Sequence, residues 1–205
     1  MSAGGDAFRG ALGAPDPSVP DGLPEGTANG YWERLKPELG CGYFMDRYLY
    51  LFGEKLQELT TCLEAWSFVV PHHEPRVILG YNAYGALLVL HENTAEPWKN
   101  RVHVLDPLHV TYTTYPSFDF LGLIGSWLPE KRIPGFFDTS VYEAWSNETG
   151  AYLDPHEVLG IGVPLSLGGA MALDNFAAQD IVEYYKTSGP TYEKALGKIS
   201  TREKR

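Results

Sequence analysis

Residues 158–169 read VLGIGVPLSLGG and are followed by Asp174-Asn175-Phe176, and this is the most distinctive stretch of the 205-residue chain. Its four glycines allow backbone angles that are closed to other residues, and they permit close approach of neighbouring segments. Leu165 and Leu167 are apolar, so we interpret the run as a buried structural connector and not as a binding loop. The residues assigned to this structural motif are Gly160, Pro164, Gly168 and Gly169.

The same stretch does not fit a nucleotide-binding loop. A dinucleotide loop requires its third glycine where Leu165 stands, and a Walker loop requires a lysine that this run lacks. Pro164 also removes a backbone N–H that a phosphate would need. The sequence therefore predicts no nucleotide cofactor at this position.

The residues around this stretch show helical periodicity. Apolar side chains recur at helical spacing over residues 120–128, 141–145, 181–185 and 192–199, and Pro129 and Gly150 mark the ends of the first two. We expect a separate helix in each of these four intervals. The C-terminal part of the chain is thus predicted to be mainly helical.

The N-terminal part has the alternation of β-strands. Aromatic runs on both sides of Asp46-Arg47 predict a hairpin over residues 42–52, and an apolar stripe predicts an amphipathic helix over 56–66. Further strands are predicted over residues 77–81, 86–91, 102–105 and 109–114. Their connections are too short for helical crossovers, so the sheet should be antiparallel. The predicted class is α+β, with flanking helices and the helical C-terminal part packed on the sheet.

The first thirty residues contain seven glycines and four prolines, which is typical of an extended arm and not of a helix or strand. Phe8, Leu12 and Val19 are the side chains expected to attach it to the body. We therefore divide the chain into an arm over residues 1–30, an α+β domain over 31–115 and a helical domain over 116–200, the last two forming one compact unit. A short helix is expected over residues 31–39, with Gly40 as its stop.

The net charge of −10 is unevenly distributed. Between Arg132 and Lys186 the chain has eight acidic residues and no lysine or arginine. Such a surface disfavours nucleic acid and favours a basic protein partner, although an acidic surface that is merely solvated remains an alternative. Trp98, in a polar loop, is a candidate interface anchor, with packing on its own sheet as the alternative. The acidic residues expected to contact the partner are Asp138, Glu143, Glu148, Asp154 and Glu157.

Candidates for catalysis or metal binding are weak. Adjacent histidines such as His72 and His73 rarely share a metal, and their prolines indicate an exposed loop, so we predict neither a metal nor any other cofactor. His156, between Asp154 and Glu157, would need a cleft and a nucleophile for acid–base work. The two cysteines, Cys41 and Cys62, are interpreted as buried thiols. We predict no catalytic residue.

Two parts of the chain resemble known domains. Residues 158–169 with Asp174-Asn175-Phe176 are similar to the C-terminal domain of immunity proteins that accompany type VI secretion DNase toxins. The order of the N-terminal motifs is similar to that of a GAD-like domain. Those motifs are FRGALGAP at residues 8–15, Tyr31-Trp32, the run from Gly42 to Phe52, Glu64-Ala-Trp66 and Ala83-Tyr84-Gly85.

The resemblance implies a bacterial immunity protein that neutralises a cognate, basic toxin by covering its active site. The alternatives are a non-catalytic regulator or scaffold of the same fold and, third, a hydrolase using His156. Residues 1–20 lack the basic start and apolar run of a secretory signal, and no apolar window approaches the length of a membrane span. We therefore expect a soluble, cytoplasmic protein.

Overall fold

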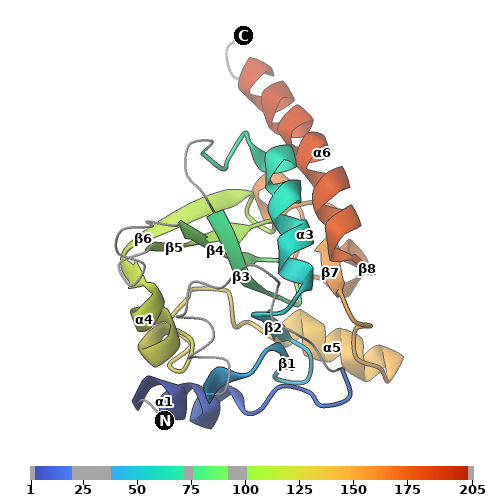
Figure 1. Ribbon diagram of the computed structural model, residues 1–205. Coiled ribbons are helices and arrows are strands. Elements are labelled where there is room, and N and C mark those ends of the chain that lie inside the picture. Colours follow the sequence, from blue (N-terminus) through green and yellow to red (C-terminus); the bar gives the residue numbers. More distant parts are fainter. Residues whose placement is uncertain (1–2, 20–37, 72–75, 92–100, 203–205) are drawn as a thin grey trace.

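The computed structural model describes residues 3–19, 38–71, 76–91 and 101–202, and its fold class is α+β, as predicted (Figure 1). A six-stranded antiparallel sheet has its strands in chain order, so each strand pairs with its sequence neighbour. The strands are β1 (Gly42–Phe44), β2 (Leu49–Leu51), β3 (Arg76–Asn82), β4 (Leu87–His91), β5 (Arg101–Asp106) and β6 (Thr111–Asp119).

Helices cover both faces of this sheet, and a second, two-stranded antiparallel sheet lies at its end. The helices are α1 (Ala3–Leu12), α3 (Lys55–Cys62), α4 (Phe120–Gly122), α5 (Ser140–Thr149) and α6 (Ile181–Arg202), and the second sheet consists of β7 (Glu157–Ile161) and β8 (Phe176–Asp180). Short 3-10 turns occupy Leu63–Trp66, Leu165–Leu167 and Leu173–Asn175, and a π-helical turn occupies Leu123–Trp127.

Alternation along the strands sorts the core into two apolar clusters. Phe44, Leu49 and Leu51 point to one face and pack with α1, α4 and α5, whereas Tyr43 and Tyr50 point to the other and pack with α3 and α6. Figure 1 shows α3 and α6 side by side on that second face. Each cluster contains residues from both sides of residue 116, so the two halves of the chain share their core.

The predicted hairpin, the helix after it and the four following strands are confirmed. The hairpin turns through residues 45–47, which all have positive φ. Gly85 has φ +78 in the turn between β3 and β4, and Gly150 ends α5 with φ +68. Glu38 and Leu39 are helical and Gly40 has φ +79, as expected for a stop, while the rest of that predicted helix lies outside the described residues.

Three predictions about elements are wrong. The extended arm is helical over Ala3–Leu12, because Phe8 and Leu12 are buried against the sheet and tertiary packing outweighs the glycine content. The two helices expected after residue 180 are one helix, which continues through Pro190. The C-terminal part also contains β7 and β8, which the helical periodicity did not predict.

The stretch from residue 158 to 176 is only in part the buried connector that we expected. Residues 158–161 form β7 and are buried, and Leu159 N–H donates to Ala83 O (2.7 Å), which fastens the small sheet to the large one. The rest turns outward, and Val163 is 48% exposed. Leu165 and Leu167 lie in a 3-10 turn and not in a strand, so they are only half-buried. Asn175 closes this loop by accepting a hydrogen bond from Val163 N–H and donating one to Val163 O (both 2.9 Å).

Candidate functional site

Helix α5 carries several of the acidic side chains predicted to meet a partner. It buries Val141 and Tyr142 and presents Glu143 and Glu148 to solvent. Asp138, just before the helix, accepts a hydrogen bond from Ser140 N–H (3.0 Å), and hydrogen bonds from Ser140 lower the pKa of its carboxyl. Thr139 Oγ1 donates to Glu143 Oε1 (2.5 Å). The hydrogen bonds from Ser140 favour the ionised form of Asp138, and the hydrogen bond from Thr139 orients the side chain of Glu143.

A cleft of about 450 Å³ opens between α5 and the β1–β2 turn, and we call it the acidic cleft. Its lining residues are Met45, Asp46, Tyr48, Thr139, Tyr142, Glu143, Ser146, Asn147 and Tyr152. Tyr142 Oη donates to the backbone oxygen of Asp46, so helix and turn are joined across the floor. Burial raises the pKa of both Tyr48 and Tyr142, so these phenols stay neutral. The cleft thus brings together carboxylates from two distant segments, Asp46 of the β1–β2 turn and Glu143 of α5.

Tyr152 stands at the mouth of the acidic cleft and is 52% exposed. A second hollow of about 590 Å³, formed with residues 12–18, lies on its other side and shares Met45, Asp46 and Tyr152 with the acidic cleft. An exposed tyrosine between two hollows is the type of residue that anchors protein interfaces, because it offers a large rigid area with a polar tip. Neither Tyr152 nor Asp46 was predicted as a site residue from the sequence.

The predicted contact residues are only partly brought together. Glu143 lines the acidic cleft, and Asp138 is the residue before Thr139, which also lines it. The other three predicted residues do not line the cleft: Glu148, Asp154 and Glu157. Asp154 is exposed, and its backbone N–H donates to Glu157 Oε2 (3.1 Å) at the start of β7. Trp98 lies outside the described residues.

The segment that closes the second hollow is held by a charged network around Asp16. Ser18 Oγ (2.6 Å) and Ser18 N–H (2.8 Å) donate to one carboxylate oxygen, and Arg47 Nε (3.0 Å) donates to the other. The hydrogen bonds from Ser18, with a further contribution from Arg47, lower the pKa of Asp16 to about 2. Asp16 N–H also donates to Tyr43 O (2.6 Å), which ties this segment to β1.

We expect the Asp16→Asn variant to melt at a lower temperature than the wild type at pH 6, with the difference closing as the pH falls toward 2. The pKa of Asp16 is depressed in the folded state, so its stabilisation is present above the unfolded value near 3.8 and is lost as pH falls through about 2. Thermal melts of both proteins between pH 2 and 7 measure this. If the difference in melting temperature between the two proteins stays constant from pH 2 to 7, the stabilisation does not come from the ionised Asp16 carboxylate.

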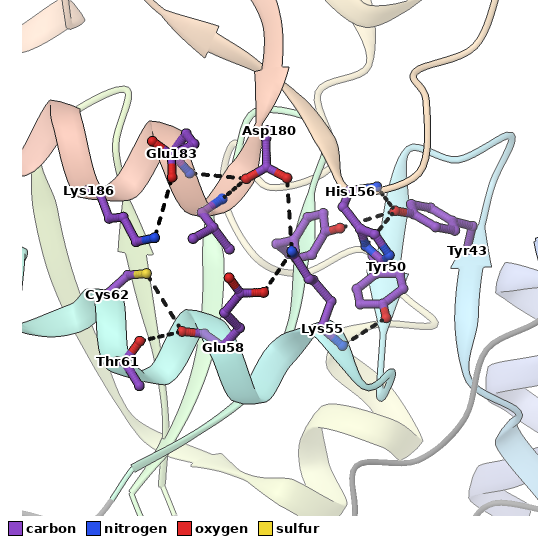
Figure 2. A network of polar contacts seen from close by, with 12 residues as sticks. Tyr43, Tyr50, Lys55, Glu58, Thr61, Cys62, His156, Asp180, Glu183 and Lys186 are labelled. Atoms are coloured by element: carbon purple, nitrogen blue, oxygen red, sulfur yellow. Dashed lines mark hydrogen bonds and ion pairs between the residues drawn. The ribbon is translucent and has the colours of Figure 1, made fainter.

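His156 is fastened into the fold by its backbone and its ring. It has φ +69, its N–H donates to Tyr43 Oη, and its backbone oxygen accepts from Ile181 N–H (2.9 Å). Its Nδ1 lies 3.4 Å from Tyr43 Oη, and its ring packs edge-on against Tyr50 (Figure 2). These contacts give His156 a structural role in joining β7 to the hairpin.

The neighbouring contacts in Figure 2 join α3 to α6. Asp180 Oδ1 accepts hydrogen bonds from the N–H groups of Val182 (2.8 Å) and Glu183 (3.1 Å) at the start of α6, while Lys55 Nζ lies 4.0 Å from its other oxygen. Cys62 is buried, and burial raises the pKa of its thiol; Cys41 is half-buried.

The described ranges contain no group of three or more histidine, cysteine, aspartate or glutamate side chains placed to hold a metal. The histidines at 72 and 73 lie outside those ranges. Among the helices of the described part of the chain, none is long and apolar enough to cross a membrane.

Fold and cleft together define an α+β protein with an acidic, solvent-open surface. The chain matches no protein-family model and no curated protein. Among solved structures it is similar to the protein Atu4351 from Agrobacterium tumefaciens, with a TM-score of 0.59 and 11% sequence identity over 90% of this chain and 88% of that one. At this identity the similarity concerns the fold alone.

Proposed function

We propose that this protein is a cytoplasmic immunity protein that binds a basic bacterial toxin and covers its active site. The observation that carries the proposal is the acidic cleft, where Asp46 and Glu143 lie on either side of a hollow with the exposed Tyr152 at its mouth. The sequence interval from residue 133 to 185, which forms α5 and Tyr152, has no lysine or arginine, and the nearby Arg47 of the β1–β2 turn is paired with Asp16. The resemblance of residues 158–176 to immunity proteins of type VI secretion DNase toxins supports the same assignment.

The proposed mechanism is stoichiometric occlusion. A nuclease active site binds phosphates through basic side chains, and ordered carboxylates can occupy the same positions. Asp138 already accepts a hydrogen bond from Ser140 N–H and Glu143 accepts one from Thr139 Oγ1, so little side-chain freedom is lost on binding. Net negative charge then accelerates encounter, and Tyr152 supplies apolar contact area.

The test is co-expression with the protein encoded by the adjacent gene. An immunity protein should rescue cells from the growth arrest that the neighbour causes, and the two proteins should co-purify. Co-purification without rescue would instead indicate a regulator or scaffold. Rescue that needs no complex, together with an activity lost in His156→Ala, would favour a hydrolase.

We expect the triple variant Glu143→Lys, Glu148→Lys and Asp154→Lys to associate with the toxin at least tenfold more slowly, because charge reversal removes electrostatic steering. All three side chains are exposed, so the fold should be retained. The matched control reverses three exposed residues elsewhere: Glu54 just before α3, Glu64 in the turn after α3, and Glu193 on α6. Stopped-flow association at two salt concentrations measures the effect, and equal rates for both triple variants would argue against binding at α5.

A further inference from the structure

A second, smaller pocket lies apart from the acidic cleft, and we call it the apolar pocket. It has a volume of about 230 Å³ and lies between the turn after β5, the loop before α5 and the loop between β7 and β8. Val104, Leu108, Phe136 and Leu165 form apolar walls. This volume is below the range of sites for drug-sized ligands, so the pocket fits one side chain of a partner.

The walls of the apolar pocket are held in place by hydrogen bonds between the three segments. Leu165 N–H donates to Leu108 O (2.8 Å), which joins the β7–β8 loop to the turn after β5. Buried Asn82 donates through Nδ2 to Phe136 O (2.9 Å), and Tyr48 Oη donates to the same oxygen (2.7 Å). The pocket is therefore preformed, and a ligand need not order it.

Two carboxylates lie in the lining of this mainly apolar pocket, which also includes Asn82 and His109. Asp106 accepts a hydrogen bond from Leu108 N–H (2.8 Å) and pairs with His109 Nδ1 (2.6 Å). Asp138, from the loop before α5, also lines the pocket, and its pKa is lowered by hydrogen bonds from Ser140. The two carboxylates come from different segments, and the nearest cation along the chain before Asp138, Arg132, pairs with Glu130.

Apolar walls with carboxylates suit a side chain that is itself apolar along its stem and cationic at its end. Arginine fits better than lysine, because its guanidinium is less strongly hydrated and can donate to two carboxylates at once. Arginine is also enriched among the residues that dominate binding energy at protein interfaces.

We propose that the apolar pocket binds an arginine side chain of the basic partner protein, with the guanidinium between Asp106 and Asp138 and the stem against Leu108 and Phe136. The identity of the partner rests on the proposed function, but arginine binding in the apolar pocket can be tested without the partner. Met171, 36% exposed and flexible, lines the pocket and adjusts to the stem.

Methionine methyl signals provide a direct readout on the full chain. The sequence has three methionines, of which Met171 lines the apolar pocket and Met45 lines the acidic cleft. Titration of ¹³C-methyl-methionine-labelled protein with N-acetyl-arginine amide should shift the Met171 signal saturably, while any shift of the Met45 signal reports separate binding in the acidic cleft. The uncharged isostere N-acetyl-citrulline amide should shift neither.

Matched variants decide whether the two carboxylates are responsible. Asn at positions 106 and 138 keeps the oxygen that accepts the backbone hydrogen bond, so Asp106→Asn with Asp138→Asn should fold normally and bind the arginine probe about tenfold more weakly. The control Glu64→Gln with Glu193→Gln makes the same change in charge elsewhere and should bind as the wild type does.

Two outcomes would overturn this assignment: an equal response of Met171 to citrulline, or unchanged binding by the double asparagine variant. The co-expression test uses the whole partner and the arginine probe uses none. If co-expression gives no rescue but Met171 responds to the arginine probe, the immunity function alone is refuted. If co-expression gives rescue but Met171 does not respond, the arginine pocket alone is refuted.

Discussion

Replacing Trp66 with alanine should lower the free energy of unfolding by about 3–5 kcal/mol, the range for removal of a buried tryptophan. The side chain is fully buried at the end of the turn that follows α3. Its ring contacts those of Tyr185 and Tyr192 on α6, with centroids 5.2 and 5.6 Å away. Its Nε1–H also donates to Tyr185 O (3.1 Å) across the interface. One substitution therefore removes both the packing and the polar contact that fasten α6.

Denaturant unfolding measures this loss, with two comparison variants. Trp66→Phe keeps an aromatic ring but leaves Tyr185 O without its side-chain donor, so we expect an intermediate cost of about 1–3 kcal/mol. The matched control is Trp145→Ala, the same truncation at a tryptophan of α5 that is only partly buried. If Trp66→Ala costs no more than Trp145→Ala, α6 is not held mainly through this residue.

The predicted elements that the structure confirms are those whose own sequence contains the reason for their burial. The apolar side chains of strands β3 to β5 point alternately to the two covered faces of the sheet. The apolar stripe of α3, with Leu56 and Leu59, packs on only one of them. The missed elements depend on partners remote in sequence. Helix α1 packs on the π-helical turn over residues 123–127, and this contact, remote in sequence, offsets the low helix propensity of its glycines.

Contacts remote in sequence also account for the two wrong predictions in the C-terminal part, the divided helix after residue 180 and the missing strands β7 and β8. Pro190 lacks the N–H for a helical hydrogen bond, and it lies in the gap between the helices predicted over residues 181–185 and 192–199, which are one helix in the structure. The preceding Gly189 lies so close to the turn after α3 that a Cβ would lie 2.2 Å from Ala65 O. Packing on that turn therefore offsets the cost of the proline. In β8, Ala177 and Ala178 have low strand propensity, and the pairing with β7 determines their conformation.

The candidate site was predicted in its charge but not in its shape. The absence of lysine and arginine around α5 predicted an acidic surface, and Glu143 and Asp138 are exposed there, while their contact with a partner stays a prediction. The cleft itself forms only when the β1–β2 turn, about 100 residues earlier in the chain, comes to lie beside the helix through the Tyr142–Asp46 hydrogen bond. No local pattern contains that contact, so Asp46 and Tyr152 became visible only in the structure.

Replacing Gly169 with valine should lower the free energy of unfolding by about 3 kcal/mol, at the upper end of the range for overpacking. A Cβ at Gly169 would lie 1.7 Å from Val163 O and 2.9 Å from Asn175 Nδ2. Backbone cannot rotate away as a side chain can, so the loop must open and lose the hydrogen bond from Asn175 to Val163 O. Leu165 and Met171 lie within this loop, and the apolar pocket should lose its shape with it.

The neighbouring glycine provides the control. Gly168 has φ +93, but a Cβ there would meet nothing within 4 Å, so Gly168→Val should cost only the backbone strain of about 1–2 kcal/mol. In a double-mutant cycle, Asn175→Ala should be less costly in the Gly169→Val background than in the wild type, because the same hydrogen bond is already lost. Additive losses would mean that the valine acts elsewhere. Folded Gly169→Val protein should also lose the response of Met171 to the arginine probe, whereas its α5 carboxylates should still attract a basic partner.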